Sequence, residues 1–300
     1  MDLPIPELSV YGISPRSIIK CKYFYIIVSE GKYYRLYPFT QSEEELRRLY
    51  ALNTRLCEKG GAVCPIVCTL DGEPFSLFGE DRFILTKVPH GHEPDIENKE
   101  DFLKMTETMA AFHKQLRDIP VEGECPPLPY EKGLGTLKHI KGIINRKNKL
   151  SEIDKMFCEN YPRVFACAQK AAEALDGCGL RQTYVYGCPK EENFILSLNG
   201  KVTLTNWNTL KISHFLADLA YIIKRFDKKN PVPQLTHKEI LRHYTKTNPL
   251  TDDEMTALCG IMDYPEKYIA ILKEYYGKHR PFAPLYVKEK LVKELKNLPQ

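Results

Sequence analysis

Residues Tyr184 to Leu210 read YVYGCPKEENFILSLNGKVTLTNWNTL, and this segment says more about the fold than any other. It opens with a short strand-like run, and a polar loop separates that run from two alternating segments, FILSL and KVTLT. Asn199-Gly200 joins the two alternating segments, and this dipeptide is a strong local signal for a tight hairpin turn. The sequence therefore predicts a strand, a loop and a hairpin, in that order.

The first part of the chain has the character of a small sheet. Residues 20–39 read as two strands joined by a turn, and residues 72–88 read as two more strands with a glycine between them. Between these pairs, Ser42 with Glu45 forms a capping-box pattern that opens a helix, and Gly60 ends it. Residues 1–88 are therefore expected to form a β-rich lobe that carries one helix.

The rest of the chain, residues 89–300, is predominantly helical in its pattern. A connector rich in proline and glycine follows Val88, and residues 120–135 are predicted to be a loop for the same compositional reason. Helical patterns occupy the segments 98–116, 151–175, 214–227, 236–247, 251–262, 264–277 and 286–298. A β-rich lobe followed by a helical lobe with one inserted hairpin is an α+β fold.

Composition excludes several classes of protein. The net charge is +4 and the basic residues are scattered among acids, so they form no stripe for binding nucleic acid. The ten cysteines include no CxxC pair, which favours free thiols in a reducing compartment over a metal site. The first ten residues, MDLPIPELSV, do not resemble a signal peptide, and no apolar run is long enough to cross a bilayer. We therefore expect a cytoplasmic protein without a transmembrane segment.

The loop and the turn around the predicted hairpin are the places where a kinase-type phosphotransferase holds its catalytic groups. Such an enzyme has a proton-accepting Asp on the loop, a metal-binding Asn five residues later, and a second Asp after the hairpin. Here Cys188 lies five residues before Asn193, and Asn206 directly follows the hairpin. The spacing fits this chemistry, but of the three residue types only Asn193 does.

These positions carry a resemblance to a known superfamily. Tyr186-Gly187-Cys188 stands in the slot of a His-Gly-Asp loop, and Asn206-Trp207-Asn208 stands in that of a metal-binding element. The segment FLADLAYIIKRF places Asp218 where a residue that braces the loop is expected. The chain thus resembles aminoglycoside phosphotransferases and choline kinases.

Within that superfamily the chain is most similar to the CotS-type spore coat proteins of endospore-forming bacteria, as a divergent member. The likeness covers roughly residues 10–297 and is carried by RLYPFTQSEEEL, MAAFHKQLRD and NPLTDDEMTALCGIMDYPEKYIAILKEYYGKHRPF. It implies a bilobal, protein-kinase-like fold with a catalytic loop at 186–193 and a metal-binding element at 206–208. It also implies a place in the spore coat, beside other coat proteins, after synthesis in the cytoplasm of the mother cell.

The resemblance further implies a nucleotide site, and its key positions are altered. Tyr37 stands where the third strand should carry a phosphate-binding Lys, while Arg35, two residues away, would point the same way along the strand. The adenine slot would lie near Lys87 and Val88. A thiol at Cys188 is a poor substitute for a proton-accepting carboxylate.

The metal-binding element is altered as well. Asn206 and Asn208 offer neutral amides where Mg²⁺ is usually held through carboxylates. We therefore predict a pseudokinase that uses neither ATP nor Mg²⁺, with Gly187 and Asp218 in structural roles.

Two alternative activities stay open. Glu191 or Glu192 could replace a missing carboxylate in an active small-molecule phosphotransferase, which would use ATP and Mg²⁺. Cys188 could instead act as a nucleophile.

The simplest interpretation gives the same residues structural roles. Cys188 is then a small residue in a tight turn, and Asn206 and Asn208 bond local backbone. Asn193 could be a loop brace or a remnant ligand. Tyr186 and His113 are expected to be packing residues.

Overall fold

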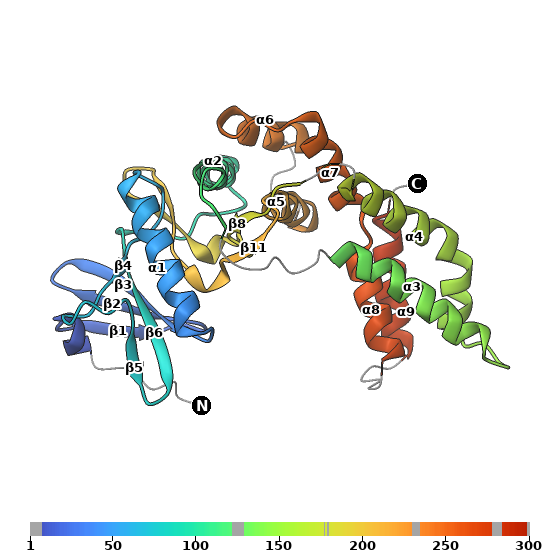
Figure 1. The fold of residues 1–300 in the computed structure, drawn as a ribbon, viewed down its shortest axis with the longest axis horizontal. Coiled ribbons are helices and arrows are strands. Elements are labelled where there is room, and N and C mark those ends of the chain that lie inside the picture. The colour runs from blue at the N-terminus through green and yellow to red at the C-terminus, as the bar shows by residue number, and fades with distance from the viewer. Residues whose placement is uncertain are drawn as a thin grey trace. The chain divides into compact units, whose positions relative to one another are not determined.

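The structure is a computed structural model that describes residues 8–121, 129–176, 178, 180–229, 235–277 and 284–298. The chain forms two compact units, each built from two separate stretches (Figure 1). The first unit comprises Met1–Glu122 and Thr183–Pro249, and the second comprises Gly123–Gln182 and Leu250–Gln300. These units are not consecutive along the chain, so the expected lobes at 1–88 and 89–300 stay a prediction.

The first unit contains an antiparallel sheet in the strand order β1-β2-β3-β6-β4, with β5 also paired to β6. Its strands are β1 (Ser17–Lys20), β2 (Tyr25–Ser29), β3 (Lys32–Phe39), β4 (Ile66–Val67), β5 (Ser76–Phe78) and β6 (Asp81–Val88). Ile27, Leu36 and Leu85 are fully buried and belong to the core of this unit. The four strands predicted from the sequence are confirmed, and β1 and β4 are additional.

Helix α1 (Glu43–Glu58) accompanies this sheet and begins where the sequence predicts. The Ser42 hydroxyl accepts a hydrogen bond from the Glu45 backbone N–H at 3.2 Å, which satisfies one free donor of the first turn. The side chain of Asn53 anchors the helix to the strand region, because it donates to Cys64 O at 2.9 Å and accepts from Ile66 N at 2.9 Å. The predicted helix is therefore confirmed.

The segment from Tyr184 to Leu210 forms the predicted hairpin. Strands β9 (Phe194–Ser197) and β10 (Val202–Leu204) pair antiparallel, and Gly200 has φ +79°, which a residue with a side chain rarely adopts. The connector adds a third strand, β7 (Gly91–His92), which pairs with β9. A side chain at Gly91 would place its Cβ 2.2 Å from Leu196 O, so only glycine permits this approach.

The first unit contains further helices and strands. They are η1 (Leu8–Tyr11), α2 (Lys99–Leu116), β8 (Thr183–Val185), η2 (Glu191–Asn193), η3 (Trp207–Thr209), β11 (Lys211–Ser213), α5 (Leu216–Lys229) and α6 (His237–Thr247). Strand β8 pairs antiparallel with β11 and leads into the loop that starts at Tyr186. Helix α2 begins after Asn98, whose side chain accepts from Glu100 N and Asp101 N. The predicted helices in this unit are confirmed.

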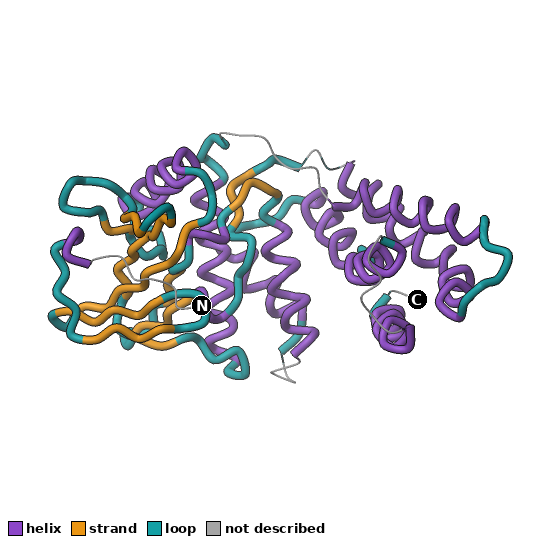
Figure 2. The backbone as a smooth tube through the Cα atoms, turned by 90° about the horizontal axis from the view of Figure 1, so that it is seen from below, coloured by secondary structure: helices purple, strands orange, loops and turns teal. Residues whose placement is uncertain are grey.

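The second unit is helical in its described residues (Figure 2). Its helices are α3 (Pro129–Asn145), α4 (Glu152–Asp176), α7 (Asp252–Asp263), α8 (Glu266–Tyr276) and α9 (Pro284–Lys296). The capping box of Thr251 and Glu254 is present at the start of α7, as predicted. Taken with the sheet of the first unit, these helices confirm the α+β class.

One prediction about this unit is wrong. Composition predicts a loop over residues 120–135, but α3 begins at Pro129, and residues 122–128 lie outside the described part. A glycine that suggests a loop serves packing instead, because a Cβ on Gly133 would lie 1.7 Å from the Tyr264 hydroxyl. Leu137, Ile140 and Ile144 supply the buried face that holds the helix in place.

Candidate functional site

The loop that starts at Tyr186 is held by Asp218. One carboxylate oxygen accepts from Tyr186 N at 2.6 Å and the other accepts from Gly187 N at 2.8 Å. Asp218 lies at the start of α5 and is only 2% exposed, so these charge-assisted bonds lie away from water. Gly187 has φ +80°, and a Cβ there would be 2.4 Å from Thr209 O. The loop can therefore take this path only with glycine at its second position.

A buried chain of polar groups continues behind Asp218. His113 Nε2 lies 3.1 Å from Asp218 Oδ2, and His113 Nδ1 lies 2.7 Å from the Tyr244 hydroxyl. Asn248 donates to that hydroxyl at 2.9 Å and accepts from Arg117 Nε at 2.7 Å. Because the Tyr244 oxygen accepts from Asn248, its own proton can be donated to Nδ1. In a neutral imidazole, this arrangement leaves the Nε2 proton for Asp218.

No local sequence pattern predicts this series of hydrogen-bonded polar groups. His113 is buried as expected, at 1% exposed, but it also makes two hydrogen bonds. Its partner Tyr244 lies 131 positions further along the sequence, and no period links the two. Only the packing of α2 against α6 and α5 brings them together.

The three asparagines form a network of their own. Asn193 donates to Cys188 O at 2.9 Å, and its side-chain oxygen accepts from Asn206 Nδ2 at 3.2 Å. Asn206 in turn accepts from Asn208 N at 3.0 Å, and Asn208 Nδ2 donates to Pro38 O at 2.6 Å. Asn193 and Asn206 thus use their side-chain oxygens in hydrogen bonds, and the loop and the turn after the hairpin are joined directly.

The residues present do not fit a magnesium ion. Mg²⁺ prefers carboxylate oxygens and demands near-octahedral geometry, whereas this cluster offers amides alone. The Asn208 side-chain oxygen is buried and makes no hydrogen bond within the described residues, but one amide carbonyl is not a ligand set. Across the described ranges, no group of three or more His, Cys, Asp or Glu side chains could hold a metal ion.

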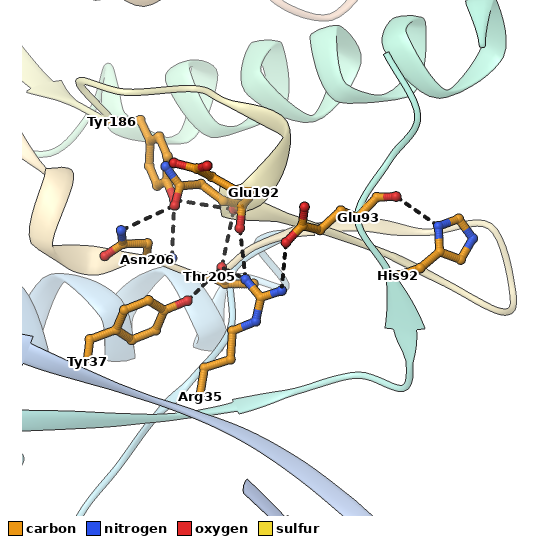
Figure 3. Close-up of polar contacts among 9 residues, drawn as sticks. Arg35, Tyr37, His92, Glu93, Tyr186, Glu192, Thr205 and Asn206 are labelled. Atoms are coloured by element: carbon orange, nitrogen blue, oxygen red, sulfur yellow. Dashed lines mark hydrogen bonds and ion pairs between the residues drawn. The ribbon is translucent and has the colours of Figure 1, made fainter. Parts of the chain in front are cut away.

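Arg35 fills the space between β3 and the loop (Figure 3). Its guanidinium donates to Glu192 O at 2.8 Å and to the Thr205 hydroxyl at 3.3 Å, and it lies 3.7 Å from a Glu93 carboxylate oxygen. The guanidinium carbon also lies 4.5 Å from the centre of the Phe24 ring. Arg35 is 5% exposed, and its Nη1 donors are used by protein acceptors.

Tyr37 points to the same side of β3, as the strand period predicts (Figure 3). Its hydroxyl donates to Thr205 Oγ1 at 3.1 Å, and the Thr205 hydroxyl donates to Asn193 O at 3.3 Å. Burial raises the pKa of Tyr37, which keeps the phenol neutral and able to donate. Tyr186 completes the group, because its hydroxyl accepts from Asn206 N at 3.1 Å.

The two residues expected near an adenine slot, Lys87 and Val88, lie on opposite faces of β6. Val88 is buried in a small apolar cluster with Cys64 and Ile195, against which Tyr33 packs. Lys87 lies on the opposite face of the strand and is exposed. The structure therefore brings Val88 to the interior of the unit and leaves Lys87 outside.

The two glutamates of the loop already have partners. Glu191 forms a bidentate ion pair with Arg225, with Arg225 Nε 2.8 Å from one carboxylate oxygen. The Glu192 carboxylate lies 3.8 Å from Lys190 Nζ at the surface. Neither carboxylate is thus a free replacement for the residue missing at position 188.

Among the described residues, no hydrogen bond between a His, Asp or Glu side chain and the Cys188 thiol is present. Cys188 is half-buried next to Tyr221. Burial, and to a lesser degree the neighbouring thiol, raises the pKa of Tyr221 to about 12. A phenol with this pKa stays protonated at neutral pH and cannot take a proton from a thiol.

Solved structures share this fold. An aminoglycoside phosphotransferase from Alicyclobacillus acidocaldarius matches with a TM-score of 0.81 at 14% identity, covering 99% of this chain and 94% of that one. The AMP-bound spectinomycin phosphotransferase APH(9)-Ia matches with a TM-score of 0.64 at 13% identity, covering 97% and 93%. A choline/ethanolamine kinase family protein from Mesorhizobium loti gives 0.57 at 13%, covering 99% and 92%. The chain therefore shares its fold with these phosphotransferases and kinases.

Sequence comparison places the chain more narrowly. No curated protein matches it. Among the described residues, no helix has both the length and the apolar character that crossing a membrane requires. Residues 8–299 match the family described as "Spore coat putative kinase YutH". Because that match spans nearly the whole chain, the chain belongs to this CotS-like spore coat family.

Proposed function

We propose that this chain is a catalytically degenerate kinase-like protein that acts as a structural or binding component of the bacterial spore coat. The observation that carries the proposal is the amide network of Asn193, Asn206 and Asn208, because Asn206 and Asn208 stand where a phosphotransferase needs carboxylates. Membership of a spore coat family supports the place of action.

The site lacks a carboxylate base and carboxylate ligands for a metal ion, and its arginine is already used in hydrogen bonds. General-base assistance is worth about 10² to 10⁴ in rate, and Cys188 offers no carboxylate for it. The oxygens of Asn193 and Asn206 already accept hydrogen bonds, and a neutral amide does not offset the charge of a metal ion. Arg35 Nη1 already donates to Glu192 O and the Thr205 hydroxyl, so this nitrogen would have to give up those bonds to contact a phosphate.

The proposal includes the cofactors, partners and location. The protein uses neither ATP nor Mg²⁺, is made in the mother-cell cytoplasm, and then binds other coat proteins. The alternative, an active phosphotransferase with a displaced carboxylate, gains no support from Glu191, because Arg225 neutralises that side chain.

Thermal unfolding with ATP, with and without Mg²⁺, tests this function. A ligand at one hundred times its dissociation constant would add about 2.7 kcal/mol, or several degrees in Tm. We expect no shift in either condition. The double variant Cys188→Asp with Asn206→Asp serves as the comparison, since it restores two carboxylates and could regain a shift that depends on Mg²⁺.

The opposite result for the unaltered chain would contradict the proposal. A Tm shift that requires both ATP and Mg²⁺ would mean that the asparagines hold a metal. Turnover of a hydroxyl-bearing small molecule that Asn193→Ala abolishes would have the same meaning.

A further inference from the structure

A groove of about 420 Å³ lies on the first unit, and its lining includes none of the asparagines of the site. We call it the α1 groove; its lining includes Arg48, Leu52 and Arg55 of α1, Ile119 and Pro120 after α2, and Tyr184 of β8. Cavities of this size hold small ligands or a few residues of a peptide. Neither the kinase-like fold nor the asparagine network accounts for it.

Two cations of the α1 groove stand along one face of the helix. Arg48, Leu52 and Arg55 are separated by four and then three positions, so they share a face, and the two arginines lie about 10 Å apart along the axis. The apolar Leu52 therefore lies between two guanidinium groups.

These two charges are poorly compensated within the protein. Arg55 makes no ion pair with any described residue. Arg48 lies 3.7 Å from Glu44, which also borders the groove, but the Glu44 side chain is 81% exposed and such a contact contributes little. The groove therefore has an excess of positive charge carried by Arg48 and Arg55.

The neighbouring Arg47 shows the contrast. It borders the groove as well, but its guanidinium is paired with both Glu43 and Glu73, at 2.9 and 2.7 Å. Its charge is thus compensated within the chain, and Arg47 adds little to the excess positive charge of the groove.

The floor of the groove is apolar. Leu52 is 5% exposed and Ile119 is 6% exposed, so each presents a small apolar area to the groove, and Pro120 and Tyr184 add to it. An occupant that fits must have an apolar group in the middle and negative charge on both sides. Two Asp or Glu side chains flanking a leucine or phenylalanine have this order.

The exposure of Arg55 favours a peptide over a small anion. Arg55 is exposed, and a small anion beside it would stay in water, where salt screens the attraction. A peptide segment covers the cations from solvent and adds the burial of its apolar side chain on the floor.

We infer that the α1 groove is a docking site for an acidic peptide segment of a partner protein, with one apolar side chain seated between two carboxylates. This inference goes beyond the proposed function, since it holds whether or not the chain transfers phosphate.

Panning a library of random peptides, each about a dozen residues long, on the full chain tests it. The unaltered chain, the double variant Arg48→Glu/Arg55→Glu and the control Arg146→Glu/Arg242→Glu are panned in parallel. The control changes the net charge by the same amount at two other exposed arginines. We expect the unaltered chain and the control to enrich peptides with acidic residues around one large apolar residue, and the double variant to lose them.

Fluorescence anisotropy with one enriched peptide then measures affinity. We expect at least tenfold weaker binding to Arg48→Glu/Arg55→Glu, and a similar loss when the peptide's apolar residue is replaced by Ser. A second variant, Arg55→Ala, checks that the loss does not arise from charge reversal, and circular dichroism checks that each variant is folded.

Any of four results would overturn the inference. The unaltered chain could enrich no acidic peptides, or the double variant could bind the enriched peptide equally well. Equal binding of the Ser peptide would mean general surface attraction. Displacement of the peptide by inorganic phosphate at equal concentration would mean that the site takes small anions.

Discussion

At the level of single residues, the conformation of the loop at the site depends on which polar groups have hydrogen-bond partners. Asp218 accepts hydrogen bonds from two backbone N–H groups and lies within hydrogen-bond distance of His113. The three asparagines form hydrogen bonds with one another or with nearby backbone. A buried polar group that keeps its partners is tolerated, whereas one that loses them is costly. These residues therefore hold the loop in one conformation. None of the three asparagines supplies a charged ligand for a metal ion.

Replacing Asp218 tests this account. Asp218→Asn removes a charge and one acceptor, and it places an amide where Tyr186 N, Gly187 N and His113 all require acceptors. We expect a loss of about 3 kcal/mol in the free energy of unfolding. Urea denaturation measures it.

Asp227→Asn is the matched control on the same helix. Asp227 pairs with His237 at the surface, where its side chain is 46% exposed, so we expect a change below about 1 kcal/mol. Equal losses in the two variants would contradict the bracing role of Asp218.

A second prediction about a single residue concerns Asp154 in the second unit. Burial alone would raise its pKa, but hydrogen bonds from Lys147, Tyr276 and Ser151 outweigh that effect and lower the pKa to about 2. In the unfolded chain the value is about 3.9. The folded form thus binds the proton more weakly, and Asp154 contributes about 2 kcal/mol of stability above pH ~4 that is lost as the pH falls towards ~2.

The difference in unfolding free energy between the unaltered chain and Asp154→Asn measures this contribution. We expect the difference to be largest between about pH 5 and 7 and to shrink as the pH approaches about 2. A difference that stays constant over this range would show that the ionised carboxylate is not the source. Glu152→Gln, whose partner Lys288 is at the surface, should change little at any pH.

Among the helices and strands, glycine has two different uses in this chain. Gly200 has positive φ and permits a turn, Gly133 and Gly91 have no room for a side chain, and both restrictions hold at Gly187. The first use is visible in the sequence, because Asn-Gly between alternating runs predicts a hairpin. The second depends on a neighbour that is far along the chain, so composition alone predicts a loop where α3 begins.

Two alanine substitutions in α3 separate these effects. Gly133→Ala places a methyl group against Tyr264, and we expect a loss of about 1–3 kcal/mol from overpacking. Gly135→Ala meets nothing within 4 Å, and we expect a gain of about 0.5–1 kcal/mol from helix propensity. Thermal unfolding of both variants decides the matter, and the same sign in both would contradict the packing role of Gly133.

Taken as a whole, the chain is divided into two units that each combine distant stretches. Each unit has its own buried side chains, such as Leu85 in the first and Ile140 in the second. Units with separate cores can unfold locally, each with its own free energy of unfolding. The site lies entirely within the first unit, so its stability is set there.

Hydrogen exchange followed by mass spectrometry tests this division. Ile140→Ala removes buried methyl groups, at a cost of about 2–5 kcal/mol. We expect faster exchange in α3, α4 and α8 and unchanged protection in β3 and β6, and the reverse pattern for Leu85→Ala. Uniform loss of protection in either variant would mean that the two units unfold as one.

Features that depend on neighbours along the chain follow from the sequence alone. The hairpin at Asn199-Gly200, the caps at Ser42, Asn98 and Thr251, and the common orientation of Arg35 and Tyr37 all follow from local spacing. The loss of carboxylates at 188, 206 and 208 is also plain from residue identity, because no conformation turns an amide or a thiol into a carboxylate.

The partners that these residues take are set by tertiary packing. Arg35 donates to Glu192 O across 157 positions, and His113 meets Tyr244 across 131. Such contacts form because buried donors and acceptors must be satisfied by whatever group the packing brings near, and no local period encodes that group. Most of the elements and the missing carboxylates thus follow from the sequence, while the packing of β3, α2 and α6 determines which hydrogen bonds the site residues make.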